Sequence, residues 1–315
     1  MKFSCSLGVA LVLLLVAGVR AQSALGSLFD RYDVTASWAQ LPAGQAWGGS
    51  TSSVVPDGKG SVIVLVRTAP HFRMFSREGQ PVKQWGDAGL FGTAHSAHIG
   101  PDGALWATDS TAHVVYKMDA AGQVVMTLGT KGTTGDNTSR TSFNGPNAVA
   151  FDAAGDIFVS DGYQNARVVH FTKEGRFVQS IGGKKGSGPG ELQLPHGVAI
   201  DRQGRVIVAD SDNKRLSLFD RAGRFLKTIA APCRGGVVAT ADGTIYASDV
   251  NGGAVTVIRN DQIADVIKVE GRPHGLGVDP ATGDVYTSST TPNVFGVSKA
   301  VVKDAVKKST TPTVR

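Results

Sequence analysis

The chain has 315 residues, of which 41% are hydrophobic and 18% charged, and its formal net charge is +6. Lys2 and Arg20 account for two of these charges and residues 299–315 for a net of four, so the rest of the chain is near neutral. A near-neutral body excludes the broad basic surface of a nucleic-acid-binding protein, and we expect no nucleic-acid partner.

Residues 1–21 are predicted to be a cleaved signal peptide. Lys2 precedes the apolar run "LGVALVLLLVAGV", and "VRA" places small residues at the −3 and −1 positions of a cut after Ala21. The run is too short for a membrane-spanning helix, and no second apolar stretch follows. We therefore expect a secreted or periplasmic protein without a membrane span. Removal of the signal leaves Cys233 as the single cysteine, so no internal disulfide can form.

The remainder of the chain is built from repeats. Four copies span residues 98–129, 147–182, 196–229 and 235–258. Each has a short apolar strand, an Asp/Gly turn, an alternating strand that ends in Asp, and two further strands separated by Gly turns. The strand-ending aspartates, called marker residues below, are Asp109, Asp161, Asp210 and Asp249.

Two degenerate copies flank these four. Residues 52–67 carry Arg67 at the marker place, and residues 274–289 end in two serines. Six four-stranded units at a period of about forty to fifty residues predict an all-β fold, a six-bladed β-propeller with four antiparallel strands per blade. We expect one propeller domain over residues 22–298, followed by a basic, disordered tail over residues 299–315.

Histidine recurs at one repeat position. Fourteen residues before the marker, or fifteen in blade six, blades two, four and six carry His95, His196 and His274. The same place holds Asn147 in blade three, Gly235 in blade five, and Ser52 or Ser53 in blade one. Alternate blades of a six-fold ring are about 120° apart, so the three imidazoles should converge on the central channel. Three imidazoles with an open fourth position are typical of a catalytic zinc site, although other divalent metals accept imidazole.

Tyr163 follows the marker of blade three in the turn "DGY" and is either a packing residue or a catalytic one. A phenol with an ordinary pKa of ~10 needs a cation nearby to act as a base near neutral pH. Arg67 is the candidate cation, with an ordinary surface arginine as the alternative. Arg167 and Arg215 recur at one blade position and are interpreted as structural.

The segments "VSDGYQNARVVHF" and "GPGELQLPHGVAID" resemble the lyase half of the peptide-amidating enzymes, peptidyl-α-hydroxyglycine α-amidating lyase, within the NHL-repeat propellers. The resemblance spans roughly residues 50–290. It implies that His95, His196 and His274 hold zinc and that Tyr163 is the catalytic base. It also implies that Arg67 stabilises the phenolate. The implied reaction cleaves the N–Cα bond of a carbinolamide to an amide and glyoxylate.

Two positions depart from that family. Ser211 stands where the family has a second active-site arginine, and Gly275 stands where it has an aspartate that helps hold calcium, so calcium is not expected. The alternative is a non-catalytic NHL-repeat propeller that binds a peptide, glycan or protein, and a lactonase-like hydrolase is a third possibility. We expect a monomer with a small-molecule or peptide substrate in the central channel.

Overall fold

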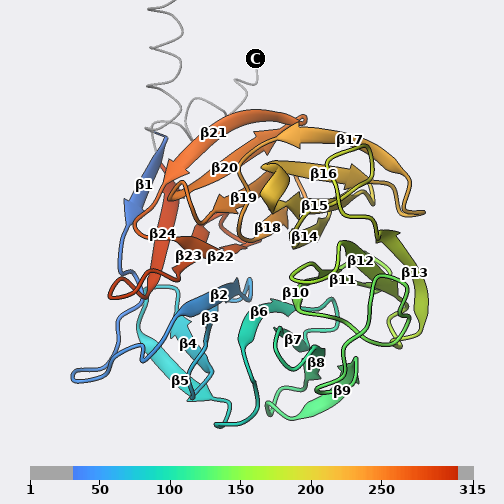
Figure 1. Ribbon diagram of the computed structural model, residues 1–315. Helices are drawn as coiled ribbons and strands as arrows, with labels where there is room; N and C mark the ends of the chain where they lie inside the picture. The colour runs from blue at the N-terminus through green and yellow to red at the C-terminus, as the bar shows by residue number, and fades with distance from the viewer. Residues whose placement is uncertain (1–30, 304–315) are drawn as a thin grey trace, which may run out of the picture.

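The computed structural model describes residues 31–303, which form six four-stranded antiparallel sheets around a central channel (Figure 1). The predicted fold class, a six-bladed propeller with four strands per blade, is confirmed. The predicted signal peptide, residues 1–21, lies outside the described residues. Within residues 31–303, no helix is long and apolar enough to cross a membrane.

In each blade the first strand lies nearest the channel and the fourth lies outermost (Figure 1). Blade one contains β2 (Thr51–Pro56), β3 (Ser61–Val66), β4 (Phe72–Ser76) and β5 (Pro81–Trp85). Blade two contains β6 (Ala94–Ile99), β7 (Leu105–Asp109), β8 (Val114–Met118) and β9 (Val124–Leu128). Blade three contains β10 (Pro146–Phe151), β11 (Ile157–Asp161), β12 (Arg167–Phe171) and β13 (Phe177–Gly182).

Blade four contains β14 (Pro195–Ile200), β15 (Val206–Asp210), the 3₁₀ turn η1 (Ser211–Asn213), β16 (Arg215–Phe219) and β17 (Phe225–Ala230). Blade five contains β18 (Val237–Ala239), β19 (Ile245–Asp249), β20 (Ala254–Arg259) and β21 (Gln262–Lys268). Blade six contains β22 (Pro273–Val278), β23 (Val285–Ser289), β24 (Val297–Val302) and, from the other end of the chain, β1 (Tyr32–Thr35).

The ring is closed by β1, which pairs antiparallel with β24 from Tyr32↔Val302 to Thr35↔Lys299. The expectation that residues 299–315 form a tail is therefore wrong for residues 299–302, which belong to the propeller. Strand β24 pairs on both sides, with β1 and β23, and Lys299 forms an ion pair with Asp284 at 2.9 Å. The sequence prediction missed the end of this strand because Lys299 and the basic residues that follow the strand suggested a solvated segment.

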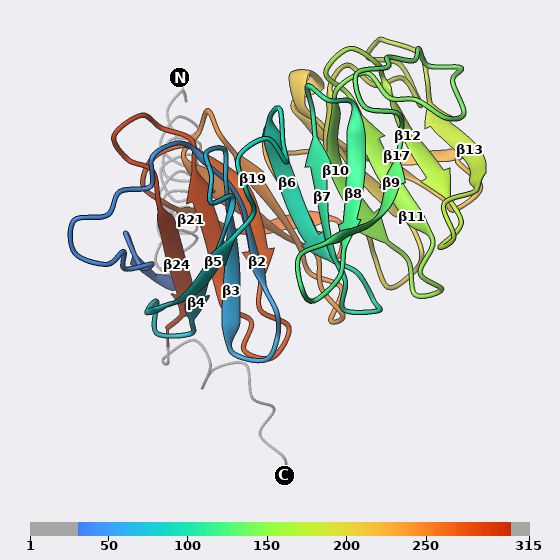
Figure 2. The same cartoon turned by 90° about the horizontal axis from the view of Figure 1, so that it is seen from below.

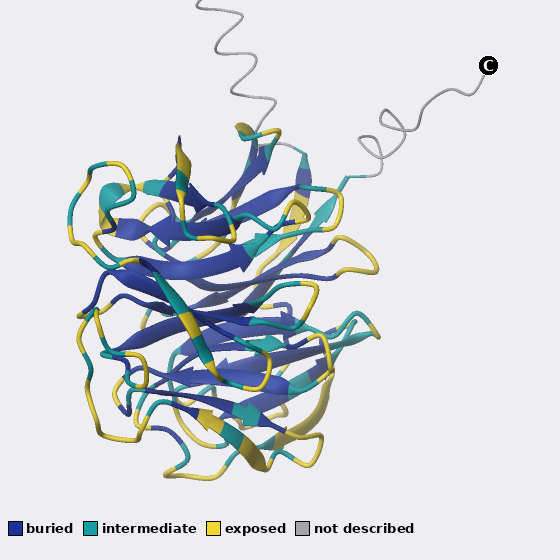
Figure 3. Ribbon diagram, turned by 90° about the vertical axis from the view of Figure 1, so that its right-hand side faces the viewer, coloured by how far each residue is buried: buried dark blue, intermediate teal, exposed yellow. Residues whose placement is uncertain are grey.

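The hydrophobic core lies between blades. Six clusters of buried residues each combine side chains from two neighbouring blades, so that every inter-blade interface has its own cluster. Between blades three and four, for example, Phe158 and Val168 pack with Val208 and Phe219. In the side view the strands of blades one and two run next to each other through the thickness of the ring (Figure 2). Exposed residues concentrate on the loops and outer strands (Figure 3). A single blade cannot bury its own faces, and the ring is the stable unit.

The marker aspartates tie the first strand of a blade to the second. The carboxylate of Asp109 accepts hydrogen bonds from the backbone N–H groups of Gly92 and Thr93 at 2.7 and 2.9 Å. Asp161 and Asp210 receive the equivalent backbone N–H groups at 2.8 Å. These bonds fix the segment that leads into each first strand, and they explain why the aspartate recurs with the repeat.

Candidate metal centre and its pocket

Each candidate metal ligand lies at a β-bulge. In blade two, Ala94 pairs with Asp109 and Ser96 with Thr108, which leaves His95 unpaired. Asn147, Ser52 and His274 are skipped in the same way in their blades, and in blade four the irregularity covers His196 and Gly197. A bulge turns a side chain out of the regular alternation of the strand. The blade-one position that the sequence left open is therefore Ser52.

The three predicted ligands converge. The ring centroids of His95, His196 and His274 are 4.7 to 5.0 Å apart, and one nitrogen from each lies within 4.8 Å of the others. Their exposed fractions are 1%, 5% and 8%. The group is placed to hold a metal ion inside the channel, as the alternate-blade spacing predicted.

The blades without histidine orient the imidazoles. Nδ1 of His95 lies 2.7 Å from the carbonyl oxygen of Asn147, and Nδ1 of His274 lies 2.8 Å from that of Ser52. His196 makes the same contact with Gly235 at 3.1 Å. Since a carbonyl can only accept, each Nδ1 carries the proton and each Nε2 keeps its lone pair. A backbone carbonyl behind a ligating histidine is the usual second layer of a metal site.

The donor set fits a metal in two further respects. Nε2 of His274 is buried and has no hydrogen-bond partner, and such an atom is costly unless something binds it. Burial, with the charges of neighbouring histidines and Arg67, holds the pKa of His95 well below its usual range. Burial is also the main cause of the low pKa values of His196, about 4, and His274, about 3. All three are therefore neutral near pH 7, which is the form that coordinates metals.

Tyr163 joins this group. Its phenol oxygen lies 2.8 Å from Nε2 of His95, although the residue as a whole is 38% exposed. The turn that carries Tyr163 is fixed to the first strand of its own blade, because the side-chain oxygen of Asn147 accepts a hydrogen bond from the N–H of Gly162 at 2.9 Å. A Cβ on Gly162 would lie 2.0 Å from the carbonyl oxygen of Pro195, so only glycine fits there. The structure thus brings the phenol to the histidines.

The electrostatic environment of Tyr163 contains opposing influences. Burial raises the pKa of the phenol, while the charges of Arg67 and Arg234 lower it, and burial dominates. The phenol is therefore protonated near neutral pH in the metal-free protein.

The structure corrects the repeat position of Arg67. Thr51 pairs with Val66, just as Ala94 pairs with Asp109, so Val66 occupies the marker place of blade one. Arg67 is one residue further on. The N–H of Arg67 bonds the Ser50 carbonyl, as the N–H of Ser211 bonds that of Leu194. The prediction placed Arg67 one residue too early because blade one lacks the aspartate that sets the alignment. Its side chain nevertheless faces the same pocket as Tyr163.

This pocket, of about 260 Å³, opens above the histidines at the end of the channel where the first strands begin. Sequence reasoning missed two of its residues, Arg234 and Arg272. Arg234 directly precedes Gly235, and Arg272 precedes His274 by two residues. Both lie within two residues of the repeat position that carries histidine in alternate blades, and this closeness could have identified them. The pocket is lined by Ser50, Arg67, Tyr163, His196, Arg234, Val250, Arg272, His274 and Thr290.

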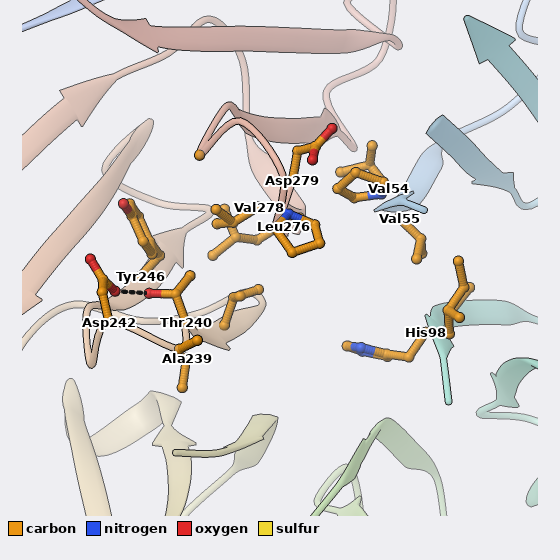
Figure 4. A pocket seen from close by; sticks show the side chains of 18 residues that line it. Val54, Val55, His98, Ala239, Thr240, Asp242, Tyr246, Leu276, Val278 and Asp279 are labelled. Atoms are coloured by element: carbon orange, nitrogen blue, oxygen red, sulfur yellow. Dashed lines mark hydrogen bonds between the residues drawn. The ribbon is translucent and has the colours of Figure 1, made fainter. Parts of the chain in front are cut away.

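The other end of the channel is different. A funnel of about 590 Å³, lined largely by apolar residues, opens where the first strands end, and Figure 4 shows His98 there with Leu276 and Val278. Burial lowers the pKa of His98 to about 4. His98 is not part of the histidine group that could hold a metal, in agreement with the sequence prediction that chose His95.

The two family departures are also explained locally. A Cβ on Gly275 would lie 2.3 Å from the Ser288 hydroxyl and 2.5 Å from the Cα of Ser53, so an aspartate does not fit there without a backbone shift. The Ser211 hydroxyl is buried and bonds the carbonyl of Cys233 at 3.1 Å. The side chain of Ser211 therefore supplies no positive charge to the pocket.

Comparison with known proteins agrees with this architecture. A family described as "6-bladed beta-propeller" matches residues 138–249. NHL repeat-containing protein 3 of Homo sapiens is 26% identical over 82% of this chain and 81% of its own length. A probable peptidyl-alpha-hydroxyglycine alpha-amidating lyase of Caenorhabditis elegans is 36% identical over 46% of this chain and 42% of its own. Peptidyl-glycine alpha-amidating monooxygenase B of Xenopus laevis is 31% identical over 70% of this chain and 28% of its own. The chain belongs to the six-bladed NHL-repeat β-propellers, and the amidating lyases are among its distant homologues.

Proposed function

We propose that this protein is a zinc-dependent lyase that cleaves the N–Cα bond of a peptidyl-α-hydroxyglycine-like carbinolamide, giving an amide and glyoxylate. The observation that carries the proposal is the 2.8 Å contact between the phenol of Tyr163 and Nε2 of His95. It places a proton-transfer group against one of three converging neutral imidazoles, which is the pairing that the reaction needs. The homologous amidating lyases support the same reaction class.

Zinc held by His95, His196 and His274 would supply a Lewis acid for the substrate hydroxyl. Tyr163 takes the hydroxyl proton as the carbinol carbon becomes an aldehyde and the C–N bond breaks. The departing nitrogen receives one proton, so the balance is one carbinolamide to one amide and one glyoxylate. Because burial raises the pKa of Tyr163, its phenolate depends on nearby positive charge, and Arg67 provides part of it.

A second candidate is a non-catalytic propeller that binds a peptide, glycan or protein partner. The favouring observation is that NHL repeat-containing protein 3 matches a larger share of this chain than the amidating lyases do. We further propose that the protein is exported and acts as a monomer.

Elemental analysis of the purified protein by mass spectrometry, followed by a glyoxylate-release assay with an α-hydroxyglycine peptide, tests the first candidate. We expect about one equivalent of zinc and time-dependent glyoxylate. A protein that binds no metal even when zinc is supplied would refute the lyase and leave the binding propeller.

A further inference from the structure

Three arginines from consecutive blades lie on one side of the pocket above the histidines. Arg234 comes from blade five, Arg272 from blade six and Arg67 from blade one, while Tyr163 comes from blade three. No acidic residue lines the pocket. The pocket is therefore strongly positive on the side opposite the phenol, and an anionic ligand is the one it suits.

The three guanidinium groups differ in the ion pairs and hydrogen bonds that they make within the protein. Arg234 is oriented by an ion pair with Asp212, Nη1 to Oδ1 at 2.7 Å, which leaves its remaining N–H groups available. Arg272 is exposed, and within residues 31–303 it forms no ion pair. Nε of Arg67 is buried without a hydrogen-bond partner. The pocket thus contains guanidinium donors that the protein itself does not satisfy.

The three arginines affect the pKa values of different residues in the site. Arg67 influences the pKa of Tyr163 and of all three histidines. Arg234 influences the pKa of Tyr163 and His196, and Arg272 that of His274. Arg67 is accordingly the arginine whose charge acts on the phenol and on all three histidines, while Arg234 and Arg272 come from the adjacent blades five and six. Because Arg234 and Arg272 line the same pocket from adjacent blades, they are the pair that can bind one anion together.

We propose that Arg234 and Arg272 bind the carboxylate of the substrate and make the enzyme selective for acids over their neutral amides. The inference rests on the proposed lyase function. In a carbinolamide of this type the carboxylate is attached to the carbon that carries the hydroxyl, one bond away. In a pocket of about 260 Å³, a hydroxyl at Tyr163 places that carboxylate on the arginine side. Guanidinium groups are suited to bind a carboxylate in a bidentate manner.

The test compares N-benzoyl-α-hydroxyglycine with its primary amide as substrates for the zinc-loaded full-length protein. For Arg272→Gln and Arg234→Gln, we expect kcat/KM for the acid to fall by about 10- to 100-fold more than for the amide. Arg272→Lys should recover part of the preference because it keeps the charge. Arg224→Gln is the matched control, because Arg224 is exposed and paired with Asp220 away from the pocket.

A binding measurement separates the two proposals. Titration calorimetry with glyoxylate requires no turnover, and we expect its affinity to fall by about 10-fold or more in Arg272→Gln. If neither substrate is turned over but glyoxylate binding still depends on both arginines, the lyase function fails and the carboxylate subsite stands. Turnover with the same acid-to-amide ratio in wild type and both variants would overturn the subsite and leave the lyase. Inorganic phosphate that binds more tightly than glyoxylate with the same arginine dependence would also overturn it.

Discussion

The phenol of Tyr163 and Nε2 of His95 meet across the boundary between blades three and two, 2.8 Å apart. Because Nδ1 of His95 donates to the carbonyl of Asn147, Nε2 is the acceptor and the phenol is the donor. If Nε2 of His95 held a metal, its lone pair would no longer be available to accept the hydrogen bond from the phenol. With a metal held there, the phenol of Tyr163 would be free to bond a substrate.

The first prediction follows from this contact. Tyr163→Phe removes the proton acceptor but keeps the ring, so glyoxylate release should fall by about 10²- to 10⁴-fold. Zinc content and thermal stability should remain those of the wild type, because the phenol is not one of the three imidazoles. A variant with unchanged turnover would show that Tyr163 is a packing residue.

The second prediction concerns the metal ligands. His196→Ala leaves two imidazoles, and we expect zinc affinity to fall by at least about 100-fold, measured by competition with a chelating dye. His98→Ala is the matched control, since His98 is a buried histidine of the same channel outside the triad. Equal zinc affinity in the two variants would exclude the proposed centre.

The third prediction is a loss of stability on mild acidification of the metal-free protein. The folded-state pKa values of His196, about 4, and His274, about 3, lie below the ordinary value of ~6.5. The unfolded chain therefore takes up protons first as the pH falls. The free energy of unfolding therefore has its full value above pH ~6.5. Below that pH it falls by up to ~1.4 kcal/mol per pH unit for each histidine.

Urea unfolding with a chelator present, between pH ~6.5 and ~4.5, isolates this effect because ordinary carboxylates titrate mostly lower. The slope of the free energy of unfolding against pH also includes a contribution from His95. His98 contributes separately, because burial lowers its pKa too. His274→Gln should reduce the slope by about one proton. A slope identical to that of the wild type would contradict the assigned direction of the pKa shift.

The fourth prediction concerns the paired arginines of blades three and four. Arg167 is fully buried, bonds Asp161 at 3.0 Å and also donates to backbone carbonyls, including that of Ser142 at 2.7 Å. Arg167→Met leaves the Asp161 carboxylate buried with fewer partners, and we expect the free energy of unfolding to fall by ~3–5 kcal/mol. Arg215→Met should cost less, since 17% of its side chain is exposed. Equal losses in urea unfolding would show that burial does not determine the strength of the pair.

The parts of the fold and site that the sequence predicted are those that repeat. The marker aspartates, such as Asp109 and Asp161, recur because each ties its own blade together. The same spacing located His95, His196 and His274, since each lies at a bulge fourteen residues before the marker place of its blade, or fifteen in blade six.

The missed features are those that do not repeat. Strand β1 is too short and polar to be recognised by itself and is specified by pairing with β24. Arg67 was misplaced by one residue because Val66 is not an aspartate. Arg234 directly precedes Gly235, whereas Arg272 precedes His274 by two residues. The two arginines therefore do not share a repeat position, and the repeat pattern does not reveal them. Their convergence depends on blades five and six being adjacent in space.

The closure of the ring by β1 sets the order in which the candidate metal centre can be completed. His274 lies in a sheet that contains both the first and the last of the described strands, and of these β24 is synthesised last. A chain interrupted before residue 297 could pair the first five blades but would leave its third imidazole in an incomplete sheet. Binding of a metal by all three histidines would therefore depend on β24 having been made and having paired with β1.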